Sequence, residues 1–174
     1  MKTLDVYMRI LQDKINESGM VSMEIYHNTV LMLKLYRKVL SVVSRRMNYL
    51  EDEIYESENK HLYNLVNSLV DLDGDFRQKR FEERMMSIEE STSLLALMEK
   101  ALILLKEESD KGEKQYDILY YYYFEKNKNT NEEIMELVDL PNTTYYRYKR
   151  RALRNFAVNL WGYIIPEICG RVLV

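Results

Sequence analysis

The longest apolar repeat in the chain runs from Met23 to Ile54 and places a hydrophobic residue at every third or fourth position. This spacing matches the 3.6-residue period of an α-helix, so one face stays apolar over about eight turns. Shorter repeats of the same kind predict helices at residues 3–16, 58–71 and 76–110. Only 5 glycines and 2 prolines interrupt 174 residues, which leaves little material for tight turns. The pattern therefore predicts an all-α fold with an N-terminal hairpin or bundle of long helices.

Glycine and serine positions divide this helical pattern into two regions. We expect Gly19 to end the first helix, Ser22 to cap the second, and Gly112 to mark a boundary. Residues 1–112 then form the helical bundle or coiled-coil region, and residues 113–174 form a C-terminal domain. The heptad-like spacing fits either an intramolecular core or a coiled-coil dimer, and periodicity alone does not decide between them. A homodimer is the assembly we expect.

Basic charge is concentrated at the C-terminal end. Residues 140–174 carry six basic side chains and one acidic side chain, although the whole chain has a net charge of −3. Such asymmetry is typical of a basic region that meets a polyanion. The single cysteine, Cys169, cannot form a disulfide within one chain, and no uncharged apolar run reaches about 18 residues. We therefore expect a cytoplasmic protein without a signal peptide or a membrane span.

The segment from residue 130 to residue 157 has the pattern of two helices joined by a short turn. Thr130 or Asn131 can cap the first helix, whose first turn is acidic. Asp139, Leu140 and Pro141 end that helix, and proline suits the start of the next one. Apolar residues at matching offsets would hold the pair together, namely Ile134, Met135, Val138, Leu140, Tyr145, Tyr148, Ala152 and Phe156. This spacing predicts a helix-turn-helix, whose second helix enters the major groove of DNA.

The outward side of the second predicted helix carries the residues that we expect to bind DNA. They are Asn142, Thr143, Thr144, Tyr146, Arg147, Lys149, Arg150, Arg151 and Arg154. Asparagine and arginine form bidentate hydrogen bonds with base edges, and threonine reaches either base edges or phosphates. Lys149, Arg151 and Arg154 lie where phosphate contacts are expected. The same helix could instead be a solvated, membrane-surface or partner-binding face, since a basic amphipathic pattern is common to all of these.

The string TNEEIMELVDLPNTTYYRYKRRAL, preceded by YYFE, resembles region four of bacterial sigma factors. It resembles most closely the phage transcriptional regulators of the ArpU and RinA type, over about a quarter of the chain. The resemblance implies a sequence-specific regulator of phage or prophage late genes, with double-stranded DNA and RNA polymerase as partners. It also implies base contacts from five of the predicted residues: Asn142, Thr143, Tyr146, Arg147 and Arg150. Met135, Asp139 and Pro141 depart from the small residue, glycine and serine usual at these positions.

A run of tyrosines and an aspartate-rich segment can each be interpreted in two ways. The tyrosine run 120–123 could stack on single-stranded bases, but packing of one or two rings inward is favoured. Asp71, Asp73, Asp75 and Glu82 fit a calcium-loop template except at its sixth position, where Phe76 replaces the required glycine, so a turn between helices is favoured. The apolar tail 158–174 is expected to pack on the N-terminal helices or on a second subunit.

The sequence contains no group of residues that indicates catalysis or metal binding. His27 and His61 have no cysteine or histidine at ligand spacing, and no phosphate-binding glycine loop or nucleophile motif is present. We therefore expect neither an enzyme nor a cofactor. The main alternative to a regulator is a helical assembly or packaging component, such as a phage small terminase subunit, in which the heptad helices would serve assembly.

Overall fold

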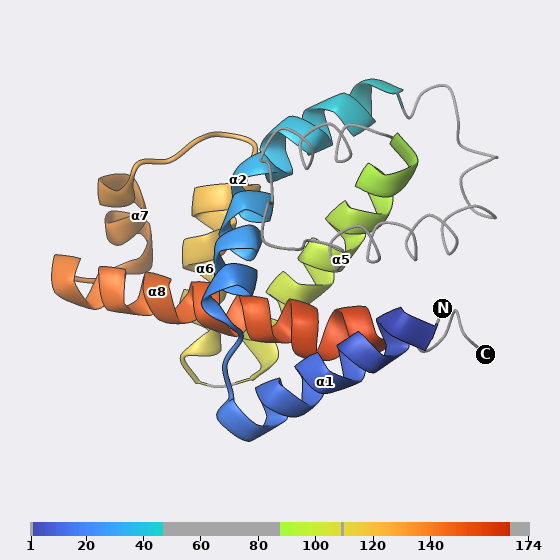
Figure 1. Ribbon diagram of the computed structural model, residues 1–174. Helices are drawn as coiled ribbons and strands as arrows, with labels where there is room; N and C mark the ends of the chain where they lie inside the picture. Colours follow the sequence, from blue (N-terminus) through green and yellow to red (C-terminus); the bar gives the residue numbers. More distant parts are fainter. Residues whose placement is uncertain (1, 47–87, 109, 168–174) are drawn as a thin grey trace.

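The computed structural model describes residues 2–46, 88–108 and 110–167, and every regular element in these ranges is helical (Figure 1). The elements are α1 (Lys2–Ser18), α2 (Met23–Arg46), α5 (Ile88–Glu107), α6 (Gly112–Leu119), the π-helical segment η2 (Tyr120–Phe124), α7 (Asn131–Val138), α8 (Asn142–Val158) and the π-helical segment η3 (Asn159–Ile164). The prediction of an all-α fold is confirmed over this part of the chain. The helix predicted at 58–71 and the break at 71–75 lie outside the described residues.

The first helix ends and the second helix begins where the sequence predicts. Gly19 has a positive φ of 67°, a conformation that glycine adopts at little cost, and its N–H donates to the carbonyl of Ile15 at 2.7 Å. Ser22 then caps α2, because its Oγ accepts a hydrogen bond from the N–H of Ile25 at 3.3 Å. Both local predictions are confirmed, and they separate α1 from α2 by a short linker.

Helices α2 and α5 lie side by side and run in opposite directions (Figure 1). Met32 and Leu33 of α2 and Leu94 and Met98 of α5 are almost completely buried in the same hydrophobic core. At the edge of this contact the hydroxyl of Tyr36 donates to the carboxylate of Glu99 at 2.8 Å. Over the described residues, the apolar face of α2 therefore packs inside a single chain. This is the intramolecular core that the sequence allowed beside a coiled-coil dimer.

The C-terminal end of the described chain packs against the N-terminal helices. The Trp161 indole N–H donates to the Thr29 hydroxyl at 3.0 Å, and both side chains are buried. The backbone of η3 approaches α1 closely, since a Cβ at Gly162 would lie 3.1 Å from the Ile15 side chain. The expectation that the apolar tail packs on the N-terminal helices is confirmed up to residue 167.

The predicted boundary at Gly112 coincides with the start of α6. Gly112 is buried so tightly that a Cβ there would lie 2.1 Å from the carbonyl oxygen of Leu105 in α5. The main hydrophobic core nevertheless continues across this position, because Leu119, Phe124 and Leu153 belong to the same buried cluster as α2 and α5. Residues on the two sides of position 112 thus share one core.

Candidate nucleic-acid interface

Helix α7 is a short helix with strong local signals at both ends. The N–H of Glu133 donates to Thr130 Oγ1 at 3.2 Å, and the N–H of Thr130 donates to Glu133 Oε2 at 2.7 Å. This reciprocal capping box satisfies two backbone donors at the start of the helix. At the other end Asp139 adopts a positive φ of 51°, which aspartate tolerates better than most residues. The predicted cap and break are both confirmed.

The junction between α7 and α8 is packed by a small apolar cluster of its own. Its buried members are Ile118, Ile134, Val138 and Tyr145, and half-buried Met135, Leu140 and Tyr148 pack against them. Ile118 comes from α6, so three helices meet at this cluster. Six of the eight predicted inner-face residues therefore meet at this cluster, whereas Ala152 and Phe156 are buried in the main core. Met135, which occupies a position where a small residue is usual in the resembled family, is accommodated at the edge.

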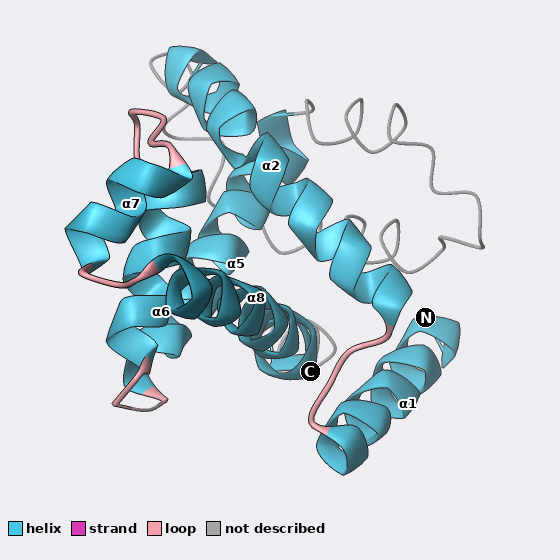
Figure 2. Cartoon of the chain, turned by 90° about the vertical axis from the view of Figure 1, so that its left-hand side faces the viewer, coloured by secondary structure: helices cyan, strands magenta, loops and turns pink. Residues whose placement is uncertain are grey.

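One side of the first turns of α8 packs on this cluster through Tyr145, and the other side faces solvent. In Figure 1 the start of α8 extends past α7, and in Figure 2 the helix is seen nearly end on. Seven of the nine predicted site residues have exposed side chains: Asn142, Thr143, Tyr146, Arg147, Arg150, Arg151 and Arg154. Thr144 is half-buried. Helix α8 contains no acidic residue, so its exposed face is uniformly basic and polar.

Lys149 differs from the other predicted site residues, because the structure turns it inward. Its Nζ donates to the side-chain carbonyl of Asn131 at 2.9 Å and lies 3.1 Å from the centre of the Tyr122 ring. Burial lowers the pKa of Lys149 to about 8. The prediction that Lys149 lies on the outward, DNA-facing side of the helix is therefore wrong. The reason is geometric, since Lys149 follows the buried Tyr145 by four positions and so lies on the same side of the helix.

A small cavity beside α8 gathers basic residues from two distant parts of the sequence. It measures about 230 Å³ and is lined by Lys111, Gln115, Arg147, Tyr148 and Arg151. Lys111 and Gln115 are absent from the predicted site. No local pattern points to them, because they reach α8 only through the packing of α6 against it.

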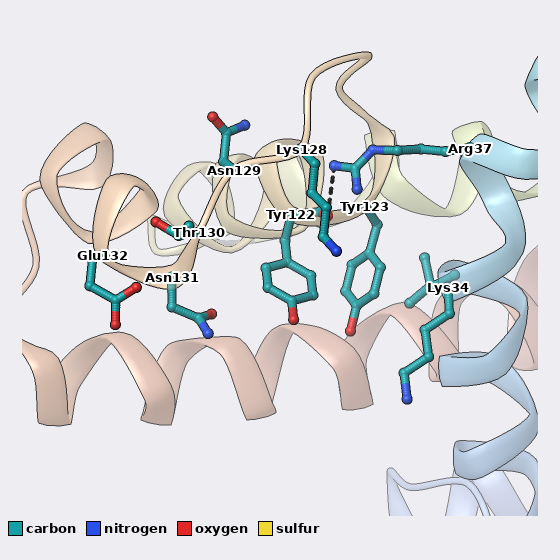
Figure 3. Close-up of a pocket in the computed structure, with 10 residues that line it drawn as sticks. Lys34, Arg37, Tyr122, Tyr123, Lys128, Asn129, Thr130, Asn131 and Glu132 are labelled. Carbon is teal, nitrogen blue, oxygen red and sulfur yellow. Dashed lines mark hydrogen bonds between the residues drawn. The ribbon is translucent and has the colours of Figure 1, made fainter.

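A larger groove of about 660 Å³ lies on another side of the junction, between α2, η2 and the start of α7 (Figure 3). Lys34 and Lys128 extend toward it from α2 and from the loop before α7, and the Tyr122 and Tyr123 hydroxyls point toward α8. The Arg37 guanidinium donates to the carbonyls of Glu125 at 2.7 Å and Tyr122 at 2.8 Å. Arg37 therefore helps to hold the end of η2 in place.

The tyrosine run forms η2 and packs mainly inward. Tyr123 and Phe124 are buried, and the Phe124 ring lies 4.3 Å from that of Tyr36 in α2. The N–H of Glu125 donates to the carbonyl of Tyr120 at 2.8 Å, the i to i+5 pattern of a π-helix. The prediction that one or two of these rings face inward is confirmed.

Two other features, a metal site and a membrane-spanning helix, have no counterpart among the described residues. Residues 2–46, 88–108 and 110–167 contain no cluster of His, Cys, Asp or Glu side chains suited to a metal ion. In the same part of the chain, no helix combines the length and apolar character needed to span a membrane. His27 is exposed, whereas His61 and the calcium-loop residues Asp71, Asp73, Asp75, Phe76 and Glu82 lie outside the described residues.

Comparison with known proteins returns no match: no protein-family model, curated protein or solved structure is similar to this chain. A functional assignment must therefore be argued from the geometry of α6, α7 and α8.

Proposed function

We propose that this protein is a sequence-specific double-stranded DNA-binding transcriptional regulator in which α7 and α8 form a helix-turn-helix. The observation that carries the proposal is the two-sided environment of α8. Tyr145 anchors one side of the helix against α6 and α7, while Thr143, Tyr146 and Arg150 on the other side are exposed. A recognition helix needs this arrangement to enter a major groove about 12 Å wide.

The exposed side chains have the spacing needed to contact adjacent base pairs. Thr143, Tyr146 and Arg150 follow one another at intervals of three and four residues and so form one stripe along α8. Arg150 can form a bidentate contact with guanine, and threonine can bond to base edges or phosphates. Arg154 continues the stripe by one more turn, where the helix would leave the groove and meet the backbone.

The resemblance to sigma region four and to phage late-gene regulators supports the same function. In this proposal the described N-terminal helices support α8 from behind and contribute to a homodimer or to contact with RNA polymerase. A two-fold dimer would place two copies of α8 on half-sites about 34–36 Å apart or at multiples of that spacing.

Selection of bound duplexes from a random pool tests the proposal directly. The enriched duplex should then lose affinity steeply between about 50 and about 200 mM salt, because binding releases counterions from the phosphates. Arg150→Ala should weaken binding, whereas Arg9→Ala, an exposed position on α1, serves as the matched control. Failure to enrich any sequence, together with affinity that does not change with salt, would overturn the assignment.

An assembly component is the second candidate, and exposed apolar residues on the first two helices favour it. Val6, Ile10 and Met23 have exposed fractions of 56%, 50% and 68%. Val6 and Ile10 lie one turn apart on α1, so they form an apolar stripe that a neighbouring subunit would cover. Light scattering separates the two functions, because a ring of many subunits indicates assembly and a monomer or dimer indicates regulation.

A further inference from the structure

The small cavity beside α8 brings three positive charges to one place. Arg147 and Arg151 lie one helical turn apart on α8, and Lys111 precedes the first residue of α6. The remaining described lining residues, Gln115 and Tyr148, are uncharged, so no carboxylate lines the cavity in the part of the chain that the structure describes. The three side chains are exposed, so water screens their mutual repulsion, and an anion held between them would be attracted by all three.

Gln115 lines this cavity with a buried polar side chain. Its side chain is 3% exposed, and its Oε1 accepts a hydrogen bond from Asn155 Nδ2 at 2.8 Å. That contact fixes the orientation of the amide. This contact uses one of the two lone pairs of the carbonyl oxygen, and the NH₂ group of Gln115 is a donor that an acceptor in the cavity can meet. A donor among three cations again specifies an acceptor-rich anion.

The start of α6 lies beside the cavity and brings an uncapped helix N-terminus, although its first turn also carries Glu113. Lys111 occupies the N-cap position, and its side chain does not cap the helix. The first backbone N–H groups of α6 therefore lie at the positive end of the helix dipole without a side-chain acceptor from the cap residue. This feature acts together with the three side chains and does not define the site alone.

We propose that this cavity, here called the Lys111 pocket, binds one backbone phosphate of the DNA duplex that α8 contacts. The inference rests on the proposed function. Two guanidinium groups one turn apart can grip a phosphate through several charge-assisted hydrogen bonds. The pocket lies beside the exposed stripe of α8, where the backbone that borders the groove would pass. Arg147 then contacts a phosphate with Arg151 and does not read a base.

The experiment combines single-phosphate neutralisation of the selected duplex with variants of the pocket. Each phosphate is replaced in turn by an uncharged methylphosphonate, and the Kd is measured for the wild type, Lys111→Ala, Arg151→Ala and the control Lys14→Ala on α1. Lys111, Arg151 and Lys14 are exposed, and thermal melts verify that each variant is folded. For the wild type and the control, neutralising one particular phosphate should cost about tenfold in affinity.

In Lys111→Ala and Arg151→Ala, neutralising that same phosphate should have little further effect. These variants should also bind every duplex sequence more weakly by a similar factor, with a log–log salt slope smaller by about one. Titration with inorganic phosphate tests whether the pocket binds a free phosphate ion in place of a phosphate of the duplex.

Three outcomes would overturn the inference. If the wild type binds the duplex and both pocket variants respond to every neutralised phosphate as it does, the Lys111 pocket is wrong while the proposed function stands. Suppose instead that the pocket binds inorganic phosphate, but that the pocket variants change the effect of no neutralised duplex phosphate. The pocket then does not bind the DNA backbone. If the wild type binds no duplex at all, the proposed function fails and the inference fails with it.

Discussion

The ammonium nitrogen of Lys149 lies 3.1 Å from the centre of the Tyr122 ring, so a cation–π contact connects α8 to η2. The same nitrogen donates to Asn131 Oδ1 at the start of α7, at 2.9 Å. The Lys149 side chain therefore joins α8 to both η2 and α7. These contacts help to fix the orientation of α8, with its stripe of exposed residues facing solvent. A partly desolvated cation–π contact contributes about 1–2 kcal/mol, which offsets part of the cost of burying the charge of Lys149.

The lowered pKa of Lys149 predicts a stability that rises with pH. The folded-state pKa is about 8, below the ordinary lysine value of 10.5. Between these values the unfolded chain binds a proton that the folded chain does not, so raising the pH favours folding. We expect the free energy of unfolding to rise by on the order of 1 kcal/mol from about pH 7 to about pH 9.5, since partial exposure weakens the effect.

Urea unfolding over this pH range measures the effect, with Lys149→Met as the matched neutral variant. The variant should lack the rise, because methionine has no proton to lose. Burial raises the pKa of Tyr36 and Tyr145, so near the top of this range the unfolded chain begins to lose protons from these hydroxyls that the folded chain keeps. This opposing effect is the same in both proteins and cancels in the comparison. An equal pH dependence in both proteins would contradict the prediction.

Asn131 joins α7 to α8 through a single oxygen atom. Its Oδ1 accepts hydrogen bonds from the Tyr145 hydroxyl and from Lys149 Nζ, both at 2.9 Å. Asn131→Ala removes the acceptor for both donors, and Tyr145 is fully buried. We expect a loss of about 1–3 kcal/mol in the free energy of unfolding by urea, whereas Asn127→Ala at an exposed loop position should change it little. Equal stability of the two variants would show that the shared acceptor is unimportant.

Features that depend on nearby residues in the chain could be predicted from the sequence. The cap at Thr130, the left-handed Asp139 and the buried face led by Tyr145 all follow from local helix chemistry. The same rules separate the exposed arginines of α8 from its apolar side. The outline of the site therefore follows from patterns that span fewer than about 30 residues.

Features that depend on packing between distant elements could not be predicted. Periodicity treats Lys149 as one more cation of a basic helix, although the Tyr122 ring and Asn131 make an inward position favourable. Lys111 and Gln115 join the site only because Gly112 lets α6 start against α5. The π-helical segments likewise reflect tertiary contacts, such as the one from Arg37 to the carbonyl of Tyr122.

Gly112 should tolerate substitution poorly, because its neighbour is backbone. A Cβ there would lie 2.1 Å from the Leu105 carbonyl oxygen, so α6 would have to move away from α5. We expect Gly112→Ala to lower the free energy of unfolding by about 2–4 kcal/mol. Gly19→Ala is the matched control, since nothing lies within 4 Å of its Cβ position and only its positive φ of 67° opposes the change. That variant should lose only about 1 kcal/mol, and a larger loss at Gly19 would contradict the argument.

The hydrogen bond between Trp161 and Thr29 should stabilise the contact between η3 and α2. The Thr29 hydroxyl accepts from the indole N–H at 3.0 Å and donates to the Ile25 carbonyl at 2.7 Å. Thr29→Val keeps the shape of the side chain but leaves the buried indole N–H without its acceptor, at a cost of about 1–3 kcal/mol. Thr29→Ser retains the hydroxyl and should lose less. Thermal unfolding of the two variants checks this order, and a Val variant as stable as the Ser variant would contradict it.

Arg150 and Arg154 lie one turn apart on the exposed face of α8, yet we expect different effects from removing them. Arg150 lies within the stripe proposed to meet base edges, so Arg150→Ala should cost about 1–3 kcal/mol and relax the preference at one base pair. Arg154 lies where the backbone is expected, so Arg154→Ala should weaken binding to all sequences by a similar factor. Affinity measurements on the selected duplex and on its single-base variants distinguish the two patterns. Unchanged base preference in Arg150→Ala would show that this side chain does not read the sequence, because loss of a base contact must change the ranking of duplexes.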